Sequence, residues 1–134
     1  NYDKVILDMG AGIDKSVRIL SGMAGHIIVM CTDEPTSLTD AYALIKLMSI
    51  QYPKCKVSVV VNQAENLQEG RRTYDILCKA CQTFLKIAPP LLGVIRRDAR
   101  IRDAIRNQMP LISRYPTSEA AADVINIARK LIEK

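Results

Sequence analysis

A run of β-branched residues near the middle of the chain constrains its fold more than any other feature. Residues 57–61 read VSVVV, so four of the five are valine. Valine favours strands, and a strand without polar alternation is covered on both faces, as the strands of parallel sheets are. We therefore expect a buried parallel strand here, with helices between it and its neighbours in sequence.

Similar apolar runs alternate with helical patterns along the rest of the chain. Apolar residues at helical spacing predict helices over residues 38–50, 65–85 and 117–134. Strands that alternate with helices form βαβ units with right-handed crossovers. The predicted fold class is α/β, with a mostly parallel sheet of about five strands flanked by helices. The predicted strands are residues 4–8, 26–31, 56–62, 91–95 and 111–113.

The predicted helices carry local start and stop signals. Thr36 and Ser37 are candidate N-caps of the first helix, and Asp40 is placed to complete a capping box with Ser37. The last helix starts near residues 117–118. Gly70 weakens the first part of the second helix, because glycine is a poor helix former.

Length and composition indicate a single domain over residues 1–134. A chain of 134 residues, 49% of them hydrophobic, can bury one core. Its longest apolar runs, residues 27–31 and 57–61, are far shorter than the ~20 residues needed to cross a bilayer. The first residues lack the charged, apolar and small-residue zones of a signal peptide, so we expect a cytoplasmic protein.

The four cysteines allow three interpretations. Cys78 and Cys81 have the spacing of a redox pair or of half a four-thiolate zinc site, whereas Cys31 and Cys55 are isolated. The pair falls midway along a helical pattern, not at a helix N-terminus, where a thiolate would be stabilised. We therefore favour reduced thiols that pack as small apolar groups.

The net charge of +5 is concentrated in one arginine-rich segment. Such a cluster binds phosphates of a nucleotide, a nucleic acid or a lipid, or it forms a solvated helix face. Helical spacing favours the solvated face: Asp98 precedes Arg102 by four residues, and Ile101, Ala104 and Ile105 would face the core. No aromatic residue is interleaved with the arginines, which argues against nucleic acid as a partner. The arginines are Arg96, Arg97, Arg100, Arg102 and Arg106.

The residues that follow each predicted strand are candidates for a site, because ligands of open α/β sheets bind beyond the carboxyl ends of the strands. Asp8 ends the first predicted strand and is followed by Gly10 and Gly12. A carboxylate there could hold Mg²⁺ through water, and the glycines would let backbone N–H groups face a phosphate. A dinucleotide fingerprint also begins in this way, but Lys15 occupies its third glycine position. A glycine turn without a ligand is the other alternative.

Several segments resemble the MinD/ParA family of ATPases, in the order in which that family has them. Residues 8–13 (DMGAGI) resemble its Walker B and switch II stretch. Residues 32–46 (TDEPTSLTDAYALIK) are similar to a signature of the FlhG/FleN branch, whose members regulate flagellar number. The resemblance covers essentially the whole chain, as the C-terminal half of such a protein from Walker B onward, without the P-loop. Further similar segments are residues 59–62 (VVVN), 68–71 (QEGR), 92–95 (LGVI) with Asp98, and 115–118 (YPTS).

The resemblance implies a phosphate side of a nucleotide site at the first strand. Asp8 would position Mg²⁺ through its waters, Gly10 would belong to the same turn, and the Gly12 N–H would face the γ-phosphate. Met9 departs from the small or hydroxyl residue that usually follows the Walker B aspartate. The alternative is a purely structural role, in which Asp8 is a turn residue at the end of a strand.

The resemblance also implies a base side. Asn62 would hydrogen-bond adenine, and the segment from Ile95 to Asp98 would form a wall beside the base. Arg96 replaces the proline that the family usually has, which leaves the shape of this wall open. Without a nucleotide, Asn62 would simply cap its strand.

For the intact protein, the resemblance implies an ATP-dependent dimeric switch that regulates flagellar number or placement, with ATP and Mg²⁺ as cofactors. Glu34 and Asp40 would lie near its dimer and partner surface, unless Glu34 is a solvated loop charge and Asp40 only a helix cap. The expected partners are a second copy of the chain, flagellar assembly proteins and, through a segment beyond Lys134, the membrane.

This chain alone is not expected to bind ATP tightly or to hydrolyse it, because phosphoryl transfer in such proteins depends on the P-loop. No catalytic residue is expected in it. Without the P-loop strand, residues 4–8 and 26–31 should pair directly, or a second copy should fill the gap by strand exchange. The alternative function is a non-catalytic α/β interaction module, whose glycine turn and basic helix bind a protein or an acidic surface.

Overall fold

Three parallel strands form the sheet of this protein. The computed structural model describes residues 1–10 and 15–133. β1 (His26–Cys31), β2 (Lys56–Ala64) and β3 (Leu91–Arg96) pair in the order β1-β2-β3. His26 lies opposite Lys56 in the first pair, and Val59 lies opposite Leu91 in the second. The α/β class is confirmed, although the described residues form three strands where five were predicted.

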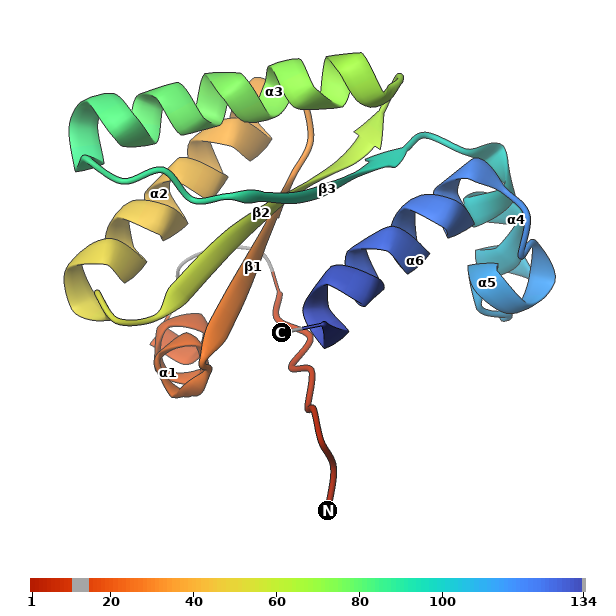
Figure 1. The fold of residues 1–134 in the computed structure, drawn as a ribbon, viewed down its shortest axis with the longest axis horizontal. Helices are drawn as coiled ribbons and strands as arrows, with labels where there is room; N and C mark the ends of the chain where they lie inside the picture. Colours follow the sequence, from red (N-terminus) through yellow and green to blue (C-terminus); the bar gives the residue numbers. More distant parts are fainter. Residues whose placement is uncertain (11–14, 134) are drawn as a thin grey trace.

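Helices connect the strands and flank the sheet (Figure 1). The strands alternate with helices along the chain, as the sequence predicts, and two short helices follow β3 before the last long one. The helices are α1 (Lys15–Met23), α2 (Pro35–Gln51), α3 (Leu67–Ala80), α4 (Ala99–Arg106), α5 (Leu111–Arg114) and α6 (Glu119–Ile132), with a π-helical turn (Cys81–Leu85) that prolongs α3.

The two faces of the sheet are covered by different helices. A side chain at Gly70 of α3 would collide with Val94 of β3, and a side chain at the neighbouring Gly93 would collide with Ile127 of α6. Since adjacent residues of a strand point to opposite faces, α3 and α6 cover opposite faces. α2 lies on the face of α3, because their buried residues belong to one cluster. That cluster contains Val29, Cys31, Ala41, Ile45, Val59, Val61, Ala64, Leu77 and Cys81.

Residues 4–8 do not form the predicted strand. They are extended but pair with neither β1 nor any other described residue, and Val5 and Ile6 are 73% and 87% exposed. The predicted direct pairing with residues 26–31 is therefore wrong. Ile28 and Met30 of β1 are themselves 38% and 53% exposed, so the helices cover this face of β1 only in part, and a strand added beside it would lack a helix to pack against. In Figure 1 this segment extends away from the sheet, on the side where β1 begins.

Residues 111–113 are helical, not the predicted fifth strand. They belong to α5, a single turn that follows Pro110, and the N–H groups of Ser113 and Arg114 both donate to the Pro110 carbonyl at 3.1 Å. Proline fixes its own φ in the range that suits the start of a helix. The two apolar residues of this run, Leu111 and Ile112, are too few to overcome this local preference.

The helix starts agree with the predictions in part. α6 starts at Glu119, close to the predicted residues 117–118, and Ser118 caps it, its Oγ accepting the Ala121 N–H at 3.1 Å. α2 begins at Pro35, three residues earlier than predicted, because proline suits the first helical position. The Ser37 Oγ accepts the Thr32 N–H at 2.9 Å, so Ser37 is not the N-cap and the capping box with Asp40 does not form.

Three of the four cysteines contribute to the core. Cys31, Cys78 and Cys81 are buried, as the packing interpretation predicts, and Cys55 is half-buried. Burial raises the pKa of the Cys31 and Cys81 thiols from 9.0 to about 11, so both are neutral at physiological pH. Over the residues that the structure describes, no helix combines the length and the apolar character that a membrane span needs.

Candidate functional site

The carboxyl ends of the three strands lie along one edge of the sheet (Figure 1). Ligands of open α/β sheets bind at this edge. We call the last residues of β2 and β3 and the segments that follow β1 and β3, residues 32–34, 62–63 and 95–98, the carboxyl-end rim. The rim contains Glu34, Asn62, Ile95 and Asp98 of the predicted site residues.

The segment after β1 folds back on the start of α2. The Glu34 N–H donates to the Thr32 Oγ1 at 3.3 Å, and Glu34 occupies the N-cap position of α2 without a side-chain cap bond. Glu34 and Asp40 are both exposed, and neither forms an ion pair with any described residue. Their carboxylates are therefore accessible on the first turns of α2.

The carboxyl end of β2 contains a bulge. Val61 lies opposite Val94 and Ala64 opposite Arg96, so Asn62 and Gln63 together face the single residue Ile95. Gln63 has φ 55°, a left-handed backbone that is uncommon for a residue other than glycine. Bulges of this kind re-aim side chains and are frequent next to functional sites.

The bulge also fixes the side chain of Asn62. Its Oδ1 accepts the Gln63 N–H at 2.9 Å, and the residue is half-buried. This bond assigns the two ends of the amide, so its Nδ2 group is the end with donors to offer. Within residues 1–10 and 15–133, no hydrogen bond occupies these donors. Asn62 can therefore donate to an acceptor placed over the rim.

The segment after β3 is fastened on several sides. The Arg96 N–H donates to the Asp123 Oδ2 of α6 at 2.9 Å, and the Arg97 N–H donates to the Ala64 carbonyl of β2 at 2.7 Å. The hydrogen bonds that the Arg96 guanidinium donates to the Asp123 carboxylate raise the pKa of the guanidinium, so its charge is retained. Arg96, the departure from the family's proline, is thus part of an ion pair within the fold.

Asp98 caps a helix, and it does not form the predicted pair with Arg102. Its Oδ1 accepts the Arg100 N–H at 3.0 Å at the start of α4, and its Oδ2 accepts the Ala120 N–H of α6 at 3.4 Å. The predicted core-facing stripe is also partly wrong, since Ala104 is buried but Ile105 is 70% exposed. The reason is that α4 is short and packs mainly on α5, which leaves most of its circumference in solvent.

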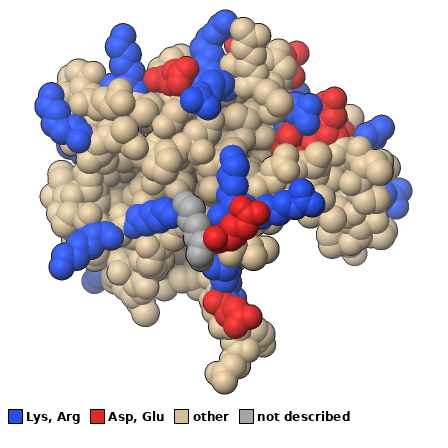
Figure 2. Space-filling model, viewed as in Figure 1, with Lys and Arg blue, Asp and Glu red and all other residues tan. Residues whose placement is uncertain are grey.

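The arginine-rich segment does not act as one unit. Arg96 pairs with Asp123 at 3.0 Å and Arg97 with Glu65 at 3.4 Å, whereas the arginines further along α4 have no ion pair with a described residue. Figure 2 shows basic side chains distributed over the visible face, with acidic ones between them. The net charge of +5 is thus not gathered into one patch on that face.

Two of the three phosphate-side residues, Asp8 and Gly10, are described by the structure, and neither follows a strand. Asp8 and Gly10 lie in the exposed N-terminal segment, where the space around Gly10 is open. Gly12 lies outside the described residues. Asp8 follows no strand of the sheet, so its predicted place at a strand tip is wrong. Its role in Mg²⁺ binding stays a prediction.

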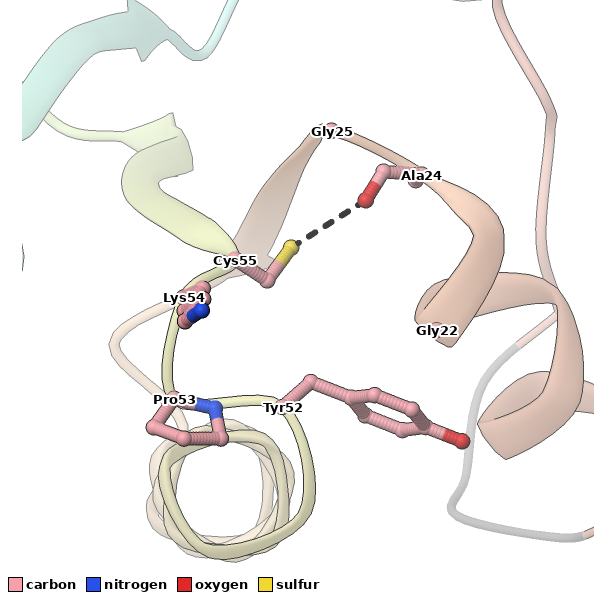
Figure 3. A pocket seen from close by; sticks show the side chains of 7 residues that line it. All are labelled: Gly22, Ala24, Gly25, Tyr52, Pro53, Lys54 and Cys55. Atoms are coloured by element: carbon pink, nitrogen blue, oxygen red, sulfur yellow. Dashed lines mark hydrogen bonds between the residues drawn. The ribbon is translucent and has the colours of Figure 1, made fainter.

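A cavity of about 430 Å³ lies at the opposite end of the sheet, where β1 and β2 begin. In Figure 3 the Tyr52 ring extends toward α1, and the Cys55 thiol donates to the Ala24 carbonyl at 3.4 Å. The residues that line this cavity include no carboxylate or imidazole that could act as an acid or a base. The lining residues are Gly22, Ala24, Gly25, Tyr52, Pro53, Lys54 and Cys55.

Two residues at or beside the rim were not predicted as site residues. Gln63 carries no signal, because nothing in its residue type indicates a left-handed backbone. Asp123, which lies beside the rim on α6, does carry one, since it is the only charged residue in the mostly apolar segment of residues 121–128. A charge in such a segment indicates a buried partner.

The chain is similar in sequence to an antiactivator and to a flagellum site-determining protein. It is 36% identical over 131 residues to the antiactivator FleN of Pseudomonas aeruginosa, covering 98% of this chain and 47% of FleN. It is 26% identical over 135 residues to the flagellum site-determining protein YlxH of Helicobacter pylori, covering 100% of this chain and 45% of YlxH. The chain thus spans about half the length of the curated relatives that it matches. No protein-family model matches it.

Solved structures share its fold. The MinD cell division protein of Aquifex aeolicus superposes with a TM-score of 0.78 at 23% identity, over 100% of this chain and 55% of MinD. The septum site-determining protein MinD of Pyrococcus horikoshii, solved with Mg-ADP, superposes with a TM-score of 0.60 at 20% identity, over 80% of this chain and 41% of that protein. Similarity to flagellar relatives over the whole chain, on a MinD-like arrangement of strands and helices, places this chain in the MinD/ParA-type ATPase family, in its FlhG/FleN-like branch.

Proposed function

We propose that the chain supplies the base side and part of the partner surface of an ATP-dependent dimeric switch that regulates flagellar number or placement. The observation that carries the proposal is the bulge that sets Asn62 and Gln63 opposite Ile95 at the carboxyl-end rim. The names of FleN and YlxH support a flagellar role, and the Mg-ADP bound to a MinD of the same fold supports a nucleotide.

The described residues fit the base of a nucleotide. Asn62 is half-buried, and its amide donors have no partner among the described residues, so they match a ring nitrogen of adenine. Ile95 is half-buried beside it and offers an apolar surface to the base. Asp98 holds the end of the wall by capping α4. These groups recognise a base and orient it, and none is placed to transfer a proton.

The described residues do not by themselves fit Mg²⁺ and the phosphates. No group of three or more His, Cys, Asp or Glu side chains in the described part of the chain is arranged to hold a metal ion. Asp8 is exposed on a segment without a sheet partner. In the intact protein we assign Asp8, Gly10 and Gly12 to the phosphate side, where Mg²⁺ would offset the phosphate charge. This chain alone should bind ATP weakly and not hydrolyse it.

The proposed partner surface includes Glu34 and Asp40, whose exposed carboxylates are free for contacts with a second copy of the chain or with flagellar assembly proteins. A nucleotide changes such an association only by binding one state more tightly than the other. We place the intact protein in the cytoplasm, with peripheral membrane attachment through a segment beyond Lys134.

Calorimetry with the full-length protein tests the base side. Asn62→Ala should weaken binding of AMP-PNP with Mg²⁺ about tenfold, because a hydrogen bond to a partly buried base contributes ~1.4 kcal/mol. Gln82→Ala, on the exposed surface of the π-helical turn, is the matched control and should leave the affinity unchanged. Equal affinities for Asn62→Ala and the control would refute the assignment. Micromolar binding of ATP by this chain alone would show that tight nucleotide binding does not depend on the P-loop.

A cell-based test addresses the flagellar role. Deletion of the gene should change the number or position of flagella per cell in electron micrographs. Reintroduction of the wild-type gene should restore the pattern, and the Asn62→Ala variant should restore it poorly. An unchanged flagellar pattern in the deletion strain would contradict this part of the proposal.

A non-catalytic interaction module is the second candidate. One observation favours it: Arg100, Arg102 and Arg106 of α4 are exposed without an ion pair to a described residue, next to the exposed Ile105. Such a surface suits an acidic partner. If the full-length protein binds no nucleotide but captures an acidic protein through α4, the module replaces the switch.

A further inference from the structure

A buried carboxylate lies beside the proposed base site. Asp123 of α6 is only 6% exposed, although carboxylates are rarely buried without a partner. Its Oδ2 accepts the Arg96 Nε at 3.0 Å and its Oδ1 accepts the Arg96 Nη2 at 3.0 Å. With the Arg96 backbone N–H on Oδ2 at 2.9 Å, three bonds join two residues. Bidentate pairs of this kind fix geometry as well as charge.

The pair is one of several attachments of the same short segment. Beyond Arg96, the Arg97 N–H donates to the Ala64 carbonyl at 2.7 Å, just past the β2 bulge. Asp98 then bonds backbone N–H groups at the starts of α4 and α6. Residues 96–98 are thus tied to β2, α4 and α6 in succession, whereas a typical connecting loop is held less densely.

The attachments adjoin the base-side residues directly. Ile95 precedes Arg96 in the chain and lies opposite the Asn62 bulge. A segment that had to become ordered when a nucleotide binds would weaken the binding, since fixing even one or two residues lowers affinity about tenfold or more. A segment that is already ordered avoids this loss.

We propose that Arg96 and Asp123 are positioning residues, which hold residues 95–98 as a preformed wall for the base of a bound nucleotide. This inference rests on the proposed function. Neither side chain needs to touch the nucleotide, because Asp123 acts through Arg96, and Arg96 acts through the backbone that it fixes.

The chain contains a matched control for the pair. Arg96 Nη1 also lies 3.6 Å from Glu119 Oε1, but Glu119 is exposed and accepts none of the backbone bonds of the segment through its side chain. Glu119→Gln therefore removes a charge next to Arg96 while leaving the bidentate pair intact. If nucleotide binding weakens when Asp123 is replaced but not when Glu119 is replaced, the cause is the lost attachment of residues 96–98.

The test compares Asp123→Asn, Arg96→Lys, Glu119→Gln and Asn62→Ala in the full-length protein. Hydrogen exchange without nucleotide should be at least about tenfold faster at residues 95–98 in Asp123→Asn, while α3 keeps its protection. The affinity for AMP-PNP with Mg²⁺ should fall about tenfold, with turnover at saturating Mg-ATP unchanged. Arg96→Lys keeps the charge and the backbone bond, so it should show smaller changes of the same kind. It also serves as the milder variant if Asp123→Asn does not fold.

The outcomes separate this inference from the proposed function. If Asp123→Asn and Arg96→Lys leave exchange at residues 95–98 unchanged, the positioning role is refuted. The positioning role is also refuted if these two variants accelerate exchange but only Asn62→Ala weakens binding. The proposed nucleotide function is retained in that case. If Asn62→Ala also has no effect on binding, both proposals fail. If Glu119→Gln weakens binding as much as Asp123→Asn does, the effect comes from the loss of a nearby negative charge, and the inference is overturned.

Discussion

Gly70 lies where α3 packs most closely on the sheet, and its replacement by alanine gives a quantitative test of that packing. An alanine Cβ at position 70 would lie 2.3 Å from Cγ1 and 3.0 Å from Cγ2 of Val94, and 3.1 Å from the Ala64 Cβ. Ordinary contacts begin at 3.4 Å, so the shortest distance is too short by 3.4 − 2.3 = 1.1 Å. Either α3 must move away from the sheet or Val94 must leave its rotamer.

Two opposing terms set the expected free-energy change for Gly70→Ala. Alanine in a helix interior is more favourable than glycine by ~1 kcal/mol. Overpacking of a well-packed contact costs ~1–3 kcal/mol, and the depth of this overlap argues for the upper half of that range. We therefore expect Gly70→Ala to lower the free energy of unfolding by ~1–2 kcal/mol.

A double-mutant cycle with Val94→Ala isolates the cause. Removal of both Val94 methyl groups deletes the two shortest contacts, so in that background Gly70→Ala should be neutral or stabilising by up to ~1 kcal/mol. The coupling free energy between the two substitutions should be ~2 kcal/mol. Urea unfolding of the four proteins, followed by circular dichroism, measures it. An equal loss of stability from Gly70→Ala in both backgrounds would refute the argument, because Val94 would then not be the obstacle.

Three further predictions concern the rest of the fold. Asp123→Ala should lower the free energy of unfolding by ~3–5 kcal/mol in urea, because it leaves Arg96 without its buried partner, whereas Arg97→Ala, from an exposed pair, should cost less than ~1 kcal/mol. Equal losses would contradict the role of burial. The free energy of unfolding should decline as pH rises from about 9 through 11, because burial raises the pKa of the Cys31 and Cys81 thiols to about 11 and the unfolded thiols ionise first. Stability is fully retained below pH 9, and a Cys31→Val variant should show a shallower decline in the same titration. Asn66→Ala should cost ~1 kcal/mol in the same urea assay, because the Asn66 Oδ1 accepts the Glu69 N–H at 2.8 Å and caps α3. No loss of stability would show that this cap does not contribute.

The sequence predicts strands well where both faces of the strand are covered. The apolar run at residues 26–31 coincides with β1, and the run at 91–95 lies within β3. The run at residues 4–8 has the same composition but no covered neighbour, so its β propensity has nothing to pack against. The run at 111–113 follows a proline that starts a helical turn. Strand formation depends on these neighbours, and composition alone does not specify them.

The candidate site was predictable to a smaller extent. The resemblance to the MinD/ParA family singled out Asn62 and Asp98, and both lie at the carboxyl-end rim, Asn62 at the end of a predicted strand and Asp98 shortly after one. The bulge at Gln63 and the pair between Arg96 and Asp123 depend on register and on contacts between residues 27 positions apart. Such features follow from tertiary packing, for which a single sequence carries only weak signals.

The structure also separates the two sides of the proposed nucleotide site physically. The base side lies on β2 and β3, which α3 and α6 cover, and the N–H groups of Arg96 and Arg97 donate to Asp123 of α6 and to Ala64 of β2. The phosphate side precedes β1, whose outer face is exposed at Ile28 and Met30. A strand with an open edge and an open face is the least constrained part of a sheet. The base wall can therefore be ordered without the phosphate side, and substitutions in one side should leave the geometry of the other unchanged.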